Sequence, residues 1–237
     1  MISVVEGMPV PQVRSTPEKW SLGDLLALQA LQPLITSYIP WTSWSMRPSA
    51  VASVVNDVML RQRRTVVELG AGSSTLVLAR AVQLTEGTLV SIEHDAGFAA
   101  ALNRQLRAAG LADRAAVHHV PLTPFPAADA PSGGRSAPTT WYDVEGLRSV
   151  TPEGIDLLIV DGPPAGDLGD VLVREPAVRV LRDRFATSYS VFLDDAEREP
   201  ERETLALWEQ QLGIPFLIVD RLTLGVGSTD GGFTPTL

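Results

Sequence analysis

The chain has 237 residues and a net charge of −9, and it contains no cysteine. This length suits one domain with a full apolar core, and the missing thiols exclude disulfides, thiolate metal sites and cysteine nucleophiles. The acidic balance, with Lys19 as the only lysine, argues against nucleic acid as a partner. No apolar run approaches the roughly 18 residues of a membrane span, and the first residues lack a secretory pattern. We therefore expect a cytoplasmic protein with no membrane partner.

Residues 1–63 precede the regular part of the pattern and begin with an arm rich in proline and polar side chains. Leucines at helical spacing follow over 21–39, with Pro33 as a break. A second amphipathic helix is predicted over 49–63. We expect this arm and its helices to form a lid or cap on a domain spanning 64–237.

From residue 65 onward, apolar segments of strand length alternate with amphipathic helices. Strands are predicted at 65–69, 88–93, 115–120, 155–161, 190–194, 215–220 and 222–228. Helices are predicted at 73–84, 96–109, 171–184 and 197–211. This alternation predicts an α/β fold with a Rossmann-like, mostly parallel seven-stranded sheet and an N-terminal helical extension. Ligands of such sheets bind beyond the carboxyl ends of the strands.

The strongest motif is VVELGAGSST, in which a strand enters a Gly-x-Gly turn and a helix begins near Ser73. Gly70 and Gly72 permit a tight turn and a close approach of a ligand to the backbone. Thr75 stands where the dinucleotide fingerprint needs a third glycine, and Glu68 before the turn would repel a diphosphate. A carboxylate there suits a cationic ligand better. The alternative is an ordinary turn between strand and helix.

Two further motifs end in acids. Glu93, in SIEHD, can accept both hydroxyls of a ribose, or it interacts with the dipole of the next helix, for which Asp95 is the better cap. IDLLIVDGPP carries Asp161 at its strand end, and VFLDDAERE carries Asp194 and Asp195. Because the carboxyl ends of parallel strands lie along one edge of a sheet, we expect these acids to gather at one site.

Together, VVELGAGSS, SIEHD and IDLLIVDGPP resemble the first, second and fourth motifs of class I S-adenosylmethionine-dependent methyltransferases, over about residues 65–228. DGPP, the WYD of 141–143 and LDDAERE look closest to the small-molecule subgroup labelled type 24. The resemblance implies that the glycine turn holds the methionine portion of the cofactor through Glu68, Gly70, Ala71, Gly72 and Ser73. It also implies that Glu93 binds the ribose, and His94 is expected to line the cofactor site.

The three aspartates gain a specific interpretation from this resemblance. Metal-dependent catechol-type O-methyltransferases carry one acid after the fourth strand and an Asp-Asn pair after the fifth, and Asp161, Asp194 and Asp195 fall in matching places. Three carboxylates suit Mg²⁺, which prefers oxygen ligands. The alternative is helix capping, with Asp194 as N-cap and Glu197 three residues later. Asp161 and Asp194 are the expected catalytic residues, with Asp161 also beside the cofactor, and Pro164 excludes the lysine base of those relatives.

Aromatic residues near the predicted site are candidates for substrate contacts. Trp141 and Tyr142 precede the fourth predicted strand and suit an aromatic substrate wall, with core packing as the alternative. Trp44, in PWTSWSMRPS, suits a lid over the substrate, and Ser43 beside it is a candidate cofactor contact. Packing between helices is the alternative for this segment.

The resemblance implies in-line transfer of the sulfonium methyl to a substrate heteroatom, by positioning and by removal of the nucleophile's proton. We therefore predict an S-adenosylmethionine-dependent methyltransferase that O-methylates a small secondary metabolite, with Mg²⁺ as a candidate second cofactor. A nicotinamide-dependent oxidoreductase and a cofactor-binding protein without turnover are the alternatives. The N-terminal helices could support a homodimer. The acceptor, the methylated atom and the general base are left open by the sequence.

Overall fold

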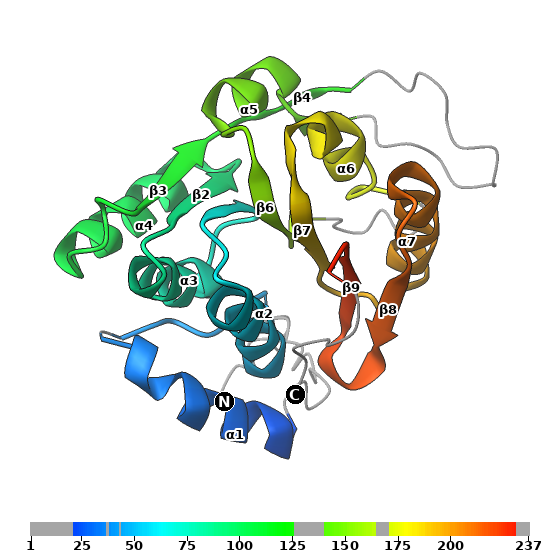
Figure 1. Ribbon diagram of the computed structural model, residues 1–237. Coiled ribbons are helices and arrows are strands. Elements are labelled where there is room, and N and C mark those ends of the chain that lie inside the picture. Colours follow the sequence, from blue (N-terminus) through cyan, green and yellow to red (C-terminus); the bar gives the residue numbers. More distant parts are fainter. Residues whose placement is uncertain (1–20, 37, 43, 126–139, 165–170, 231–237) are drawn as a thin grey trace, which may run out of the picture.

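The computed structural model describes residues 21–36, 38–42, 44–125, 140–164 and 171–230. Its centre is a seven-stranded sheet in the order β3–β2–β1–β6–β7–β9–β8 (Figure 1). The strands are β1 Thr65–Leu69, β2 Thr88–Glu93, β3 Ala115–His119, β6 Ile155–Val160, β7 Phe185–Leu193, β8 Phe216–Val219 and β9 Leu224–Ser228. The first five are parallel, and β9 is antiparallel to both β7 and β8. The predicted α/β Rossmann-like sheet is confirmed.

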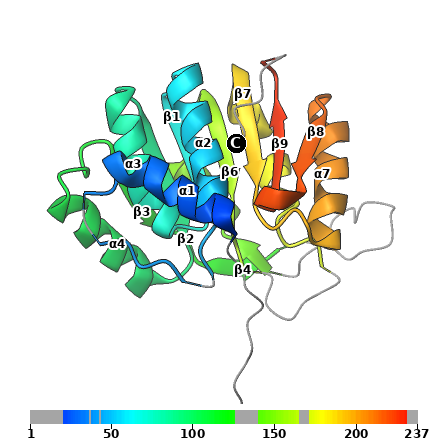
Figure 2. The same ribbon diagram turned by 90° about the horizontal axis from the view of Figure 1, so that it is seen from below.

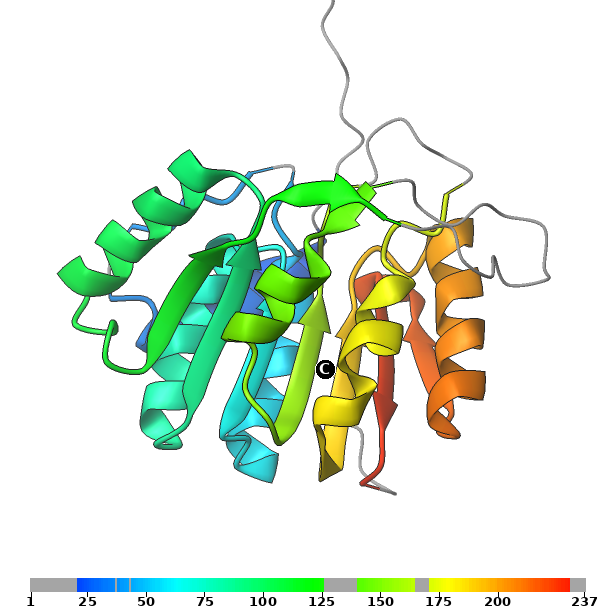
Figure 3. The same ribbon diagram turned by 90° about the horizontal axis from the view of Figure 1, so that it is seen from above.

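Helices cover both faces of this sheet (Figures 2 and 3). One face carries α2 Pro48–Arg61, α3 Ser73–Leu84 and α4 Ala96–Ala108, with α1 Leu22–Leu31 outside α2, and the other carries α5 Val144–Val150, α6 Pro176–Leu181 and α7 Glu199–Leu212. The short 3₁₀ helices are η1 Gln32–Leu34, η2 Arg182–Arg184 and η3 Asp220–Leu222. Each face has its own apolar cluster, and neighbouring residues such as Val66 and Val67 of β1 belong to different clusters. This alternation is expected of strands that are buried on both faces.

The path of the chain creates a crevice between β1 and β6. The chain runs outward from β1 to β2 and β3, and then returns to the other side of β1 as β6. Leu69 pairs with Val160, so the turns that follow β1 and β6 emerge side by side. A small antiparallel sheet, β4 Leu122–Pro124 with β5 Thr140–Tyr142, lies beyond these strand ends (Figure 3). Ligands of open α/β sheets bind at such a reversal of strand order.

Most predicted elements are present, and the differences have local causes. β7 begins at Phe185 rather than at 190, and the helix predicted over 171–184 is reduced to α6 and η2. The sequence FATSYS mixes polar and apolar residues, and much of its side-chain surface is exposed, which disguises the first half of β7. The pattern also does not predict β4, β5 or α5, which flank or interrupt the long segment 121–153, rich in proline, glycine and serine.

The N-terminal helices pack into the same core as the sheet. Ala27 of α1 and Val54 of α2 belong to the apolar cluster that also contains residues of β1 and α3. Asp24 joins the two helices, because its buried carboxylate accepts hydrogen bonds from Arg47 and from the Ser49 hydroxyl. α2 is therefore a covering layer of the sheet. The boundary at 63/64 and the role of lid or cap stay predictions.

Leu22, Leu25 and Leu26 of α1 are exposed. The homodimer expected from the N-terminal helices stays a prediction. Among the described residues, no helix has both the length and the apolar character needed to cross a membrane.

Candidate active site

A cavity of about 620 Å³ opens beyond the carboxyl ends of β1, β2 and β6. Its walls are formed by residues of 40–42 and 44–46, the turn from β1 into α3, the end of β2 with α4, the end of β5, and the residues that follow β6. The lining residues are Pro40, Thr42, Trp44, Ser45, Met46, Gly70, Ala71, Gly72, Ser73, Ser74, Leu76, Glu93, His94, Asp95, Phe98, Leu102, Tyr142, Asp161, Gly162 and Pro164. The cavity thus lies at the reversal of strand order, where the fold places ligands.

The glycine turn after β1 packs directly against the turn after β6. Gly70 has a φ of 93°, a conformation that favours glycine, and a Cβ there would lie 2.7 Å from the carbonyl carbon of Asp161. A Cβ on Gly162 would lie 2.7 Å from the Tyr142 hydroxyl oxygen. Both glycines are therefore needed for the close approach of the two turns, and both line the cavity.

Ser73 fixes the N-terminal wall to the start of α3. Its hydroxyl donates to the Pro40 carbonyl at 2.7 Å and lies 3.0 Å from the Ser45 hydroxyl. Trp44 continues this wall into solvent, with 79% of its surface exposed. Ser43, the predicted cofactor contact in this segment, lies outside the described residues.

Glu68 is not among the residues that line the cavity, and its contact with the cofactor stays a prediction. Its carboxylate is fully buried and accepts hydrogen bonds from Ser74 at 2.5 Å, Thr75 at 2.6 Å and Ser91 at 2.6 Å. Burial raises the pKa of Glu68, and the three hydroxyls oppose that rise. Glu68 therefore braces the glycine turn against α3 and β2. Thr75, which replaces the third glycine of the dinucleotide fingerprint, is one of its partners.

Glu93 and His94 both line the cavity, at the end of β2. The Oε1 atom of Glu93 accepts the backbone N–H of Asp95 at 2.7 Å and lies 2.9 Å from Nδ1 of His94. Within the described ranges, no hydrogen bond reaches Oε2 of Glu93, so this oxygen can accept hydroxyl groups of a ligand. Asp95 caps α4 as expected, since its side chain accepts the N–H of Phe98 at 2.7 Å.

Of the two adjacent aromatic residues Trp141 and Tyr142, only Tyr142 lines the cavity. Trp141 is fully buried, packs against Phe125 and does not line the cavity, so the structure favours core packing over a substrate wall. Tyr142 is also fully buried, yet it lines the cavity. Its hydroxyl has no hydrogen-bond partner among the described residues. Burial raises the pKa of Tyr142, with Glu93 adding to the rise, so this hydroxyl stays protonated.

The three aspartates come together around a buried arginine that precedes α6. Nη2 of Arg174 lies 3.3 Å from Oδ1 of Asp161 and 3.0 Å from Oδ2 of Asp195. Its Nη1 donates to the backbone carbonyl of Asp194 at 2.7 Å. Asp161 lines the cavity, whereas Asp194 and Asp195 lie behind it. The Thr223 hydroxyl donates to Oδ1 of Asp194 at 3.3 Å.

Helix capping by Asp194, one of the two interpretations left open by the sequence, is wrong. α7 begins at Glu199, and Arg198 is its N-cap residue. Asp195 instead turns the chain, with a φ of 58°, and its carbonyl accepts the N–H of Arg198 at 2.9 Å.

The same carboxylates have the right chemistry for a hard cation but not the right surroundings. One oxygen from each of Asp161, Asp194 and Asp195 lies within 4.8 Å of the others, an all-oxygen set of the kind that Mg²⁺ prefers. Arg174 already pairs with two of these three acids. A divalent ion would meet this guanidinium as a like charge, so the residues do not fit Mg²⁺.

Burial and mutual repulsion dominate the electrostatics of this cluster. Burial raises the pKa of Asp161 well above its ordinary value, with the charge of Asp194 adding to the rise and Arg174 opposing it. The pKa of Asp194 is raised to about 7 by burial and by Asp195. Because they interact strongly, the two carboxyls titrate as a pair. The cavity therefore contains a carboxyl group, that of Asp161, whose pKa lies well above the ordinary value of an aspartate.

Sequence reasoning missed Arg174, and the fold explains why. The guanidinium reaches the aspartates only because β6 and β7 pair and the segment before α6 crosses their ends. VLVREPAV contains no motif that marks its arginine. A cluster of several acids on neighbouring strand ends is itself a signal that a buried cation balances them.

Comparison with known proteins gives this geometry a family. A family model described as a methyltransferase domain matches residues 67–196. The chain belongs to this methyltransferase family. The matched segment runs from β1 past the aspartate pair after β7, so it includes every wall of the cavity except the N-terminal one. Membership confirms the expected S-adenosylmethionine-dependent class I methyltransferase and sets the nicotinamide-dependent alternative aside.

Solved structures of similar fold agree with the family. A methyltransferase of Podospora anserina bound to S-adenosylhomocysteine has a TM-score of 0.54 and 14% identity, covering 90% of this chain and 87% of its own. A Geobacter sulfurreducens methyltransferase has a TM-score of 0.53 and 15% identity, with 90% and 91% covered. The O-methyltransferase TomG of Streptomyces achromogenes, bound to SAM, has a TM-score of 0.50 and 17% identity, with 90% and 92% covered. No curated protein matches the sequence.

Proposed function

We propose that this methyltransferase transfers the methyl group of S-adenosylmethionine to a hydroxyl oxygen of a small molecule. The observation that carries the proposal is the Asp161 carboxyl, which lines the cavity beside the glycine turn and has a raised pKa. A cavity of about 620 Å³ in an acidic protein suits a small acceptor better than a nucleic acid. TomG, a structure of similar fold, is named an O-methyltransferase.

The cofactor is assigned to the half of the cavity formed by β1 and β2. Gly70, Ala71, Gly72 and Ser73 line it and would hold the methionine portion, with backbone N–H groups at the start of α3 available to a carboxylate. Oε2 of Glu93 would accept the ribose hydroxyls, and His94 would lie beside the ribose. Ser43, which lies outside the described residues, stays a candidate contact.

The acceptor is assigned to the side of Asp161. A lone pair of the acceptor oxygen attacks the methyl carbon, the bond from that carbon to sulfur breaks, and its electron pair stays on sulfur, giving S-adenosylhomocysteine. The hydroxyl proton passes to the Asp161 carboxylate, for which a raised pKa provides driving force. Asp194, behind Asp161, is a positioning residue in this proposal, because it does not line the cavity.

Two aromatic residues would contact the bound molecules. The Tyr142 hydroxyl lies beside Gly162 and has no partner among the described residues, so a ligand oxygen can accept its hydrogen bond. Trp44, exposed at the rim, would cover the acceptor. Trp141 is not included, because it packs in the core. Mg²⁺ is not included either, because Arg174 already pairs with its expected ligands.

The function is tested by incubating the protein with S-adenosylmethionine and a panel of phenols, aliphatic alcohols and amines, and measuring S-adenosylhomocysteine release. We expect release above background with at least one hydroxyl compound, and the methylated oxygen identified by mass spectrometry and NMR. Turnover with amines alone would overturn O-methylation while leaving the methyltransferase assignment in place.

A further inference from the structure

We propose that Arg174 is the resident cation of the three-aspartate cluster, so that this protein binds no divalent metal there and transfers methyl groups without one. The second half of this statement rests on the proposed function, whereas the first concerns metal binding alone.

The guanidinium occupies the centre of the cluster. Nη2 contacts one oxygen each of Asp161 and Asp195, and Nη1 lies 4.0 Å from Glu201. The side chain of Arg174 is only 4% exposed. An ion bound by the same carboxylate oxygens would therefore lie against a buried positive charge, with little water to screen the repulsion.

Arg174 is held by the backbone as well as by the acids. Its Nη1 donates to the Asp194 carbonyl at 2.7 Å, and its Nη2 approaches the Asp161 carbonyl at 3.4 Å. These carbonyls directly follow β7 and β6, which pair with each other inside the sheet. An incoming ion could free the carboxylates only by also breaking these hydrogen bonds.

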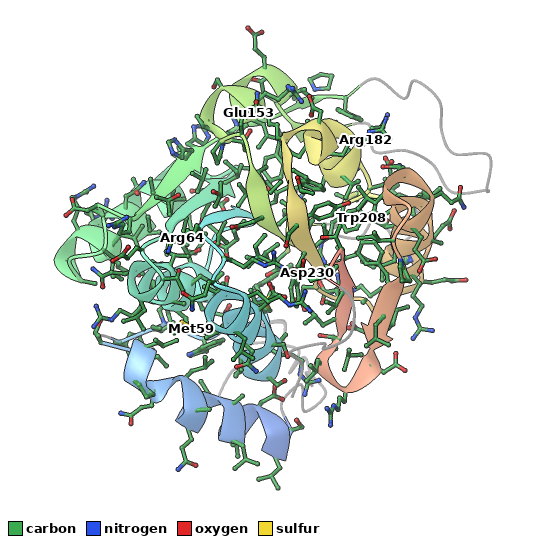
Figure 4. All side chains as sticks on the ribbon, viewed as in Figure 1. Met59, Arg64, Glu153, Arg182, Trp208 and Asp230 are labelled. Atoms are coloured by element: carbon green, nitrogen blue, oxygen red, sulfur yellow. The ribbon has the colours of Figure 1, made fainter. Side chains whose placement is uncertain are left out.

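The segment that carries Arg174 is itself anchored. Glu175 is buried, and its carbonyl accepts the indole N–H of Trp208 at 2.9 Å. Trp208 points from α7 toward the sheet (Figure 4) and is fully buried in the apolar cluster of that face. A movement of Arg174 away from the aspartates would therefore disturb the packing of α7.

The arginine can orient Asp161 as a metal would. Because Nη2 pairs with both Asp161 and Asp195, it links the carboxyl that lines the cavity to the fixed turn after β7. A guanidinium orients carboxylates through directed hydrogen bonds and stays charged at all working pH values. Arg174 is thus a positioning residue for Asp161.

The decisive experiment is titration of the full-length protein with Mn²⁺, followed by electron paramagnetic resonance of the free ion. We expect the wild type to leave Mn²⁺ free throughout the micromolar range, and its melting temperature to be the same in EDTA as in millimolar Mg²⁺. Saturable Mn²⁺ binding by the wild type that is lost in Asp161→Asn would overturn the proposal.

Two variants test whether the guanidinium of Arg174 excludes Mn²⁺ from the cluster. Arg174→Met should gain Mn²⁺ binding and a melting temperature that rises with Mn²⁺, because it leaves three neighbouring carboxyls without their cation. Arg198→Ala is the matched control: Arg198 lies 3.0 Å from the same Asp195 oxygen, but its side chain is 45% exposed. It should bind no Mn²⁺. A folded Arg174→Met that still ignores Mn²⁺ would refute the exclusion by Arg174, and if that variant does not fold, the wild-type titration decides alone.

Activity gives a separate result. Wild-type turnover in EDTA equal to turnover in Mg²⁺ is expected, and activity that collapses in EDTA and returns with Mg²⁺ would refute the proposal. Failure of the proposed function can be distinguished from failure of this inference. A protein with no turnover on any hydroxyl compound would still show, in the Mn²⁺ titration, whether the aspartate cluster binds a divalent ion.

Discussion

Buried arginines pair with aspartates at both ends of the sheet, but in different proportions. At the end where the parallel strands begin, Arg63 lies 2.7 Å from both Asp57 and Asp230, and Arg61 lies 2.9 Å from Asp230. Two arginines face two aspartates. Burial opposes ionisation of Asp230, but the hydrogen bond from Ser188 and the two arginines outweigh it and lower its pKa.

At the carboxyl ends of the same strands, the charges do not balance. One buried arginine, Arg174, faces the carboxyls of Asp161, Asp194, Asp195 and Glu201. Burial raises the pKa of Asp161, Asp194 and Glu201. The half-exposed Arg198 is a further partner of Asp195.

The difference separates a structural cluster from a reactive one. The balanced cluster pairs each aspartate with an arginine and joins α2 to the strands β7 and β9, so its role is structural. In the unbalanced cluster, burial and repulsion raise the pKa of the carboxyls, and this cluster holds the proton acceptor that we propose. Such a local conflict is expected at functional sites. Each prediction below changes one end of the sheet and uses the other for comparison.

The largest expected effect is on catalysis. It is tested by two variants, one at each end of β6. Asp161→Asn removes the proton acceptor and should lower kcat by about 10²–10⁴-fold. Asp156→Asn is the control, because Asp156 lies near the start of β6 and accepts the backbone N–H groups of Arg64 and Thr65. It should leave kcat within about twofold of the wild type. Equal losses in both variants would contradict the assignment of the active site to the carboxyl end.

Removing an arginine from the balanced cluster should affect stability alone. Arg63→Met leaves the buried carboxylate of Asp57 without its main partner and should lower the free energy of unfolding by about 3–5 kcal/mol. Urea denaturation measures this loss. Calorimetry on the folded variant should give an unchanged affinity for S-adenosylhomocysteine, and a weakened affinity would show that the two ends are coupled.

The two clusters should respond to pH with opposite signs. The raised pKa of Asp194 means that the folded protein holds its proton more tightly, so its contribution to stability is complete below the ordinary pKa of 3.8 and is lost as pH rises through about 7. For Asp230, whose pKa is lowered, the contribution is present above 3.8 and is lost as pH falls.

Asp194→Asn isolates the contribution of Asp194 to the pH dependence of stability. Between about pH 4 and about pH 7, the free energy of unfolding of the wild type should fall by up to about 4 kcal/mol because of Asp194. The variant should not show this fall, and urea denaturation at each pH measures it. If the free energy of unfolding depended on pH in the same way in the wild type and in Asp194→Asn, the raised pKa of Asp194 would be contradicted.

The smallest effect is expected at two tyrosines. Tyr142→Phe removes a hydroxyl that has no partner among the described residues, so stability should change by less than about 0.5 kcal/mol. Affinity for the cofactor product or for the acceptor should fall by about 5- to 10-fold. Tyr189→Phe, in the first half of β7, should change neither affinity. Wild-type affinities in Tyr142→Phe would remove Tyr142 from the site.

Local patterns were enough to predict the sheet, the glycine turn and the strand ends that carry Glu93 and Asp161. Strand and helix periodicity, glycine at a turn and an acid at a strand end are all properties of short segments. The roles of Glu68 and Arg174 depend on contacts between segments distant in sequence, such as Ser91 with Glu68 and Arg174 with Asp195. A pattern read along one chain does not contain these pairings, so it could not distinguish a cofactor contact from a brace, or a metal from an arginine.

The central claim is that the cavity between β1, β2 and β6 binds S-adenosylmethionine. It is tested most directly by isothermal titration of the wild-type protein with S-adenosylhomocysteine and, separately, with NAD. The account predicts saturable one-to-one binding of S-adenosylhomocysteine at micromolar concentration and no binding of NAD. Binding of NAD without binding of S-adenosylhomocysteine would contradict it.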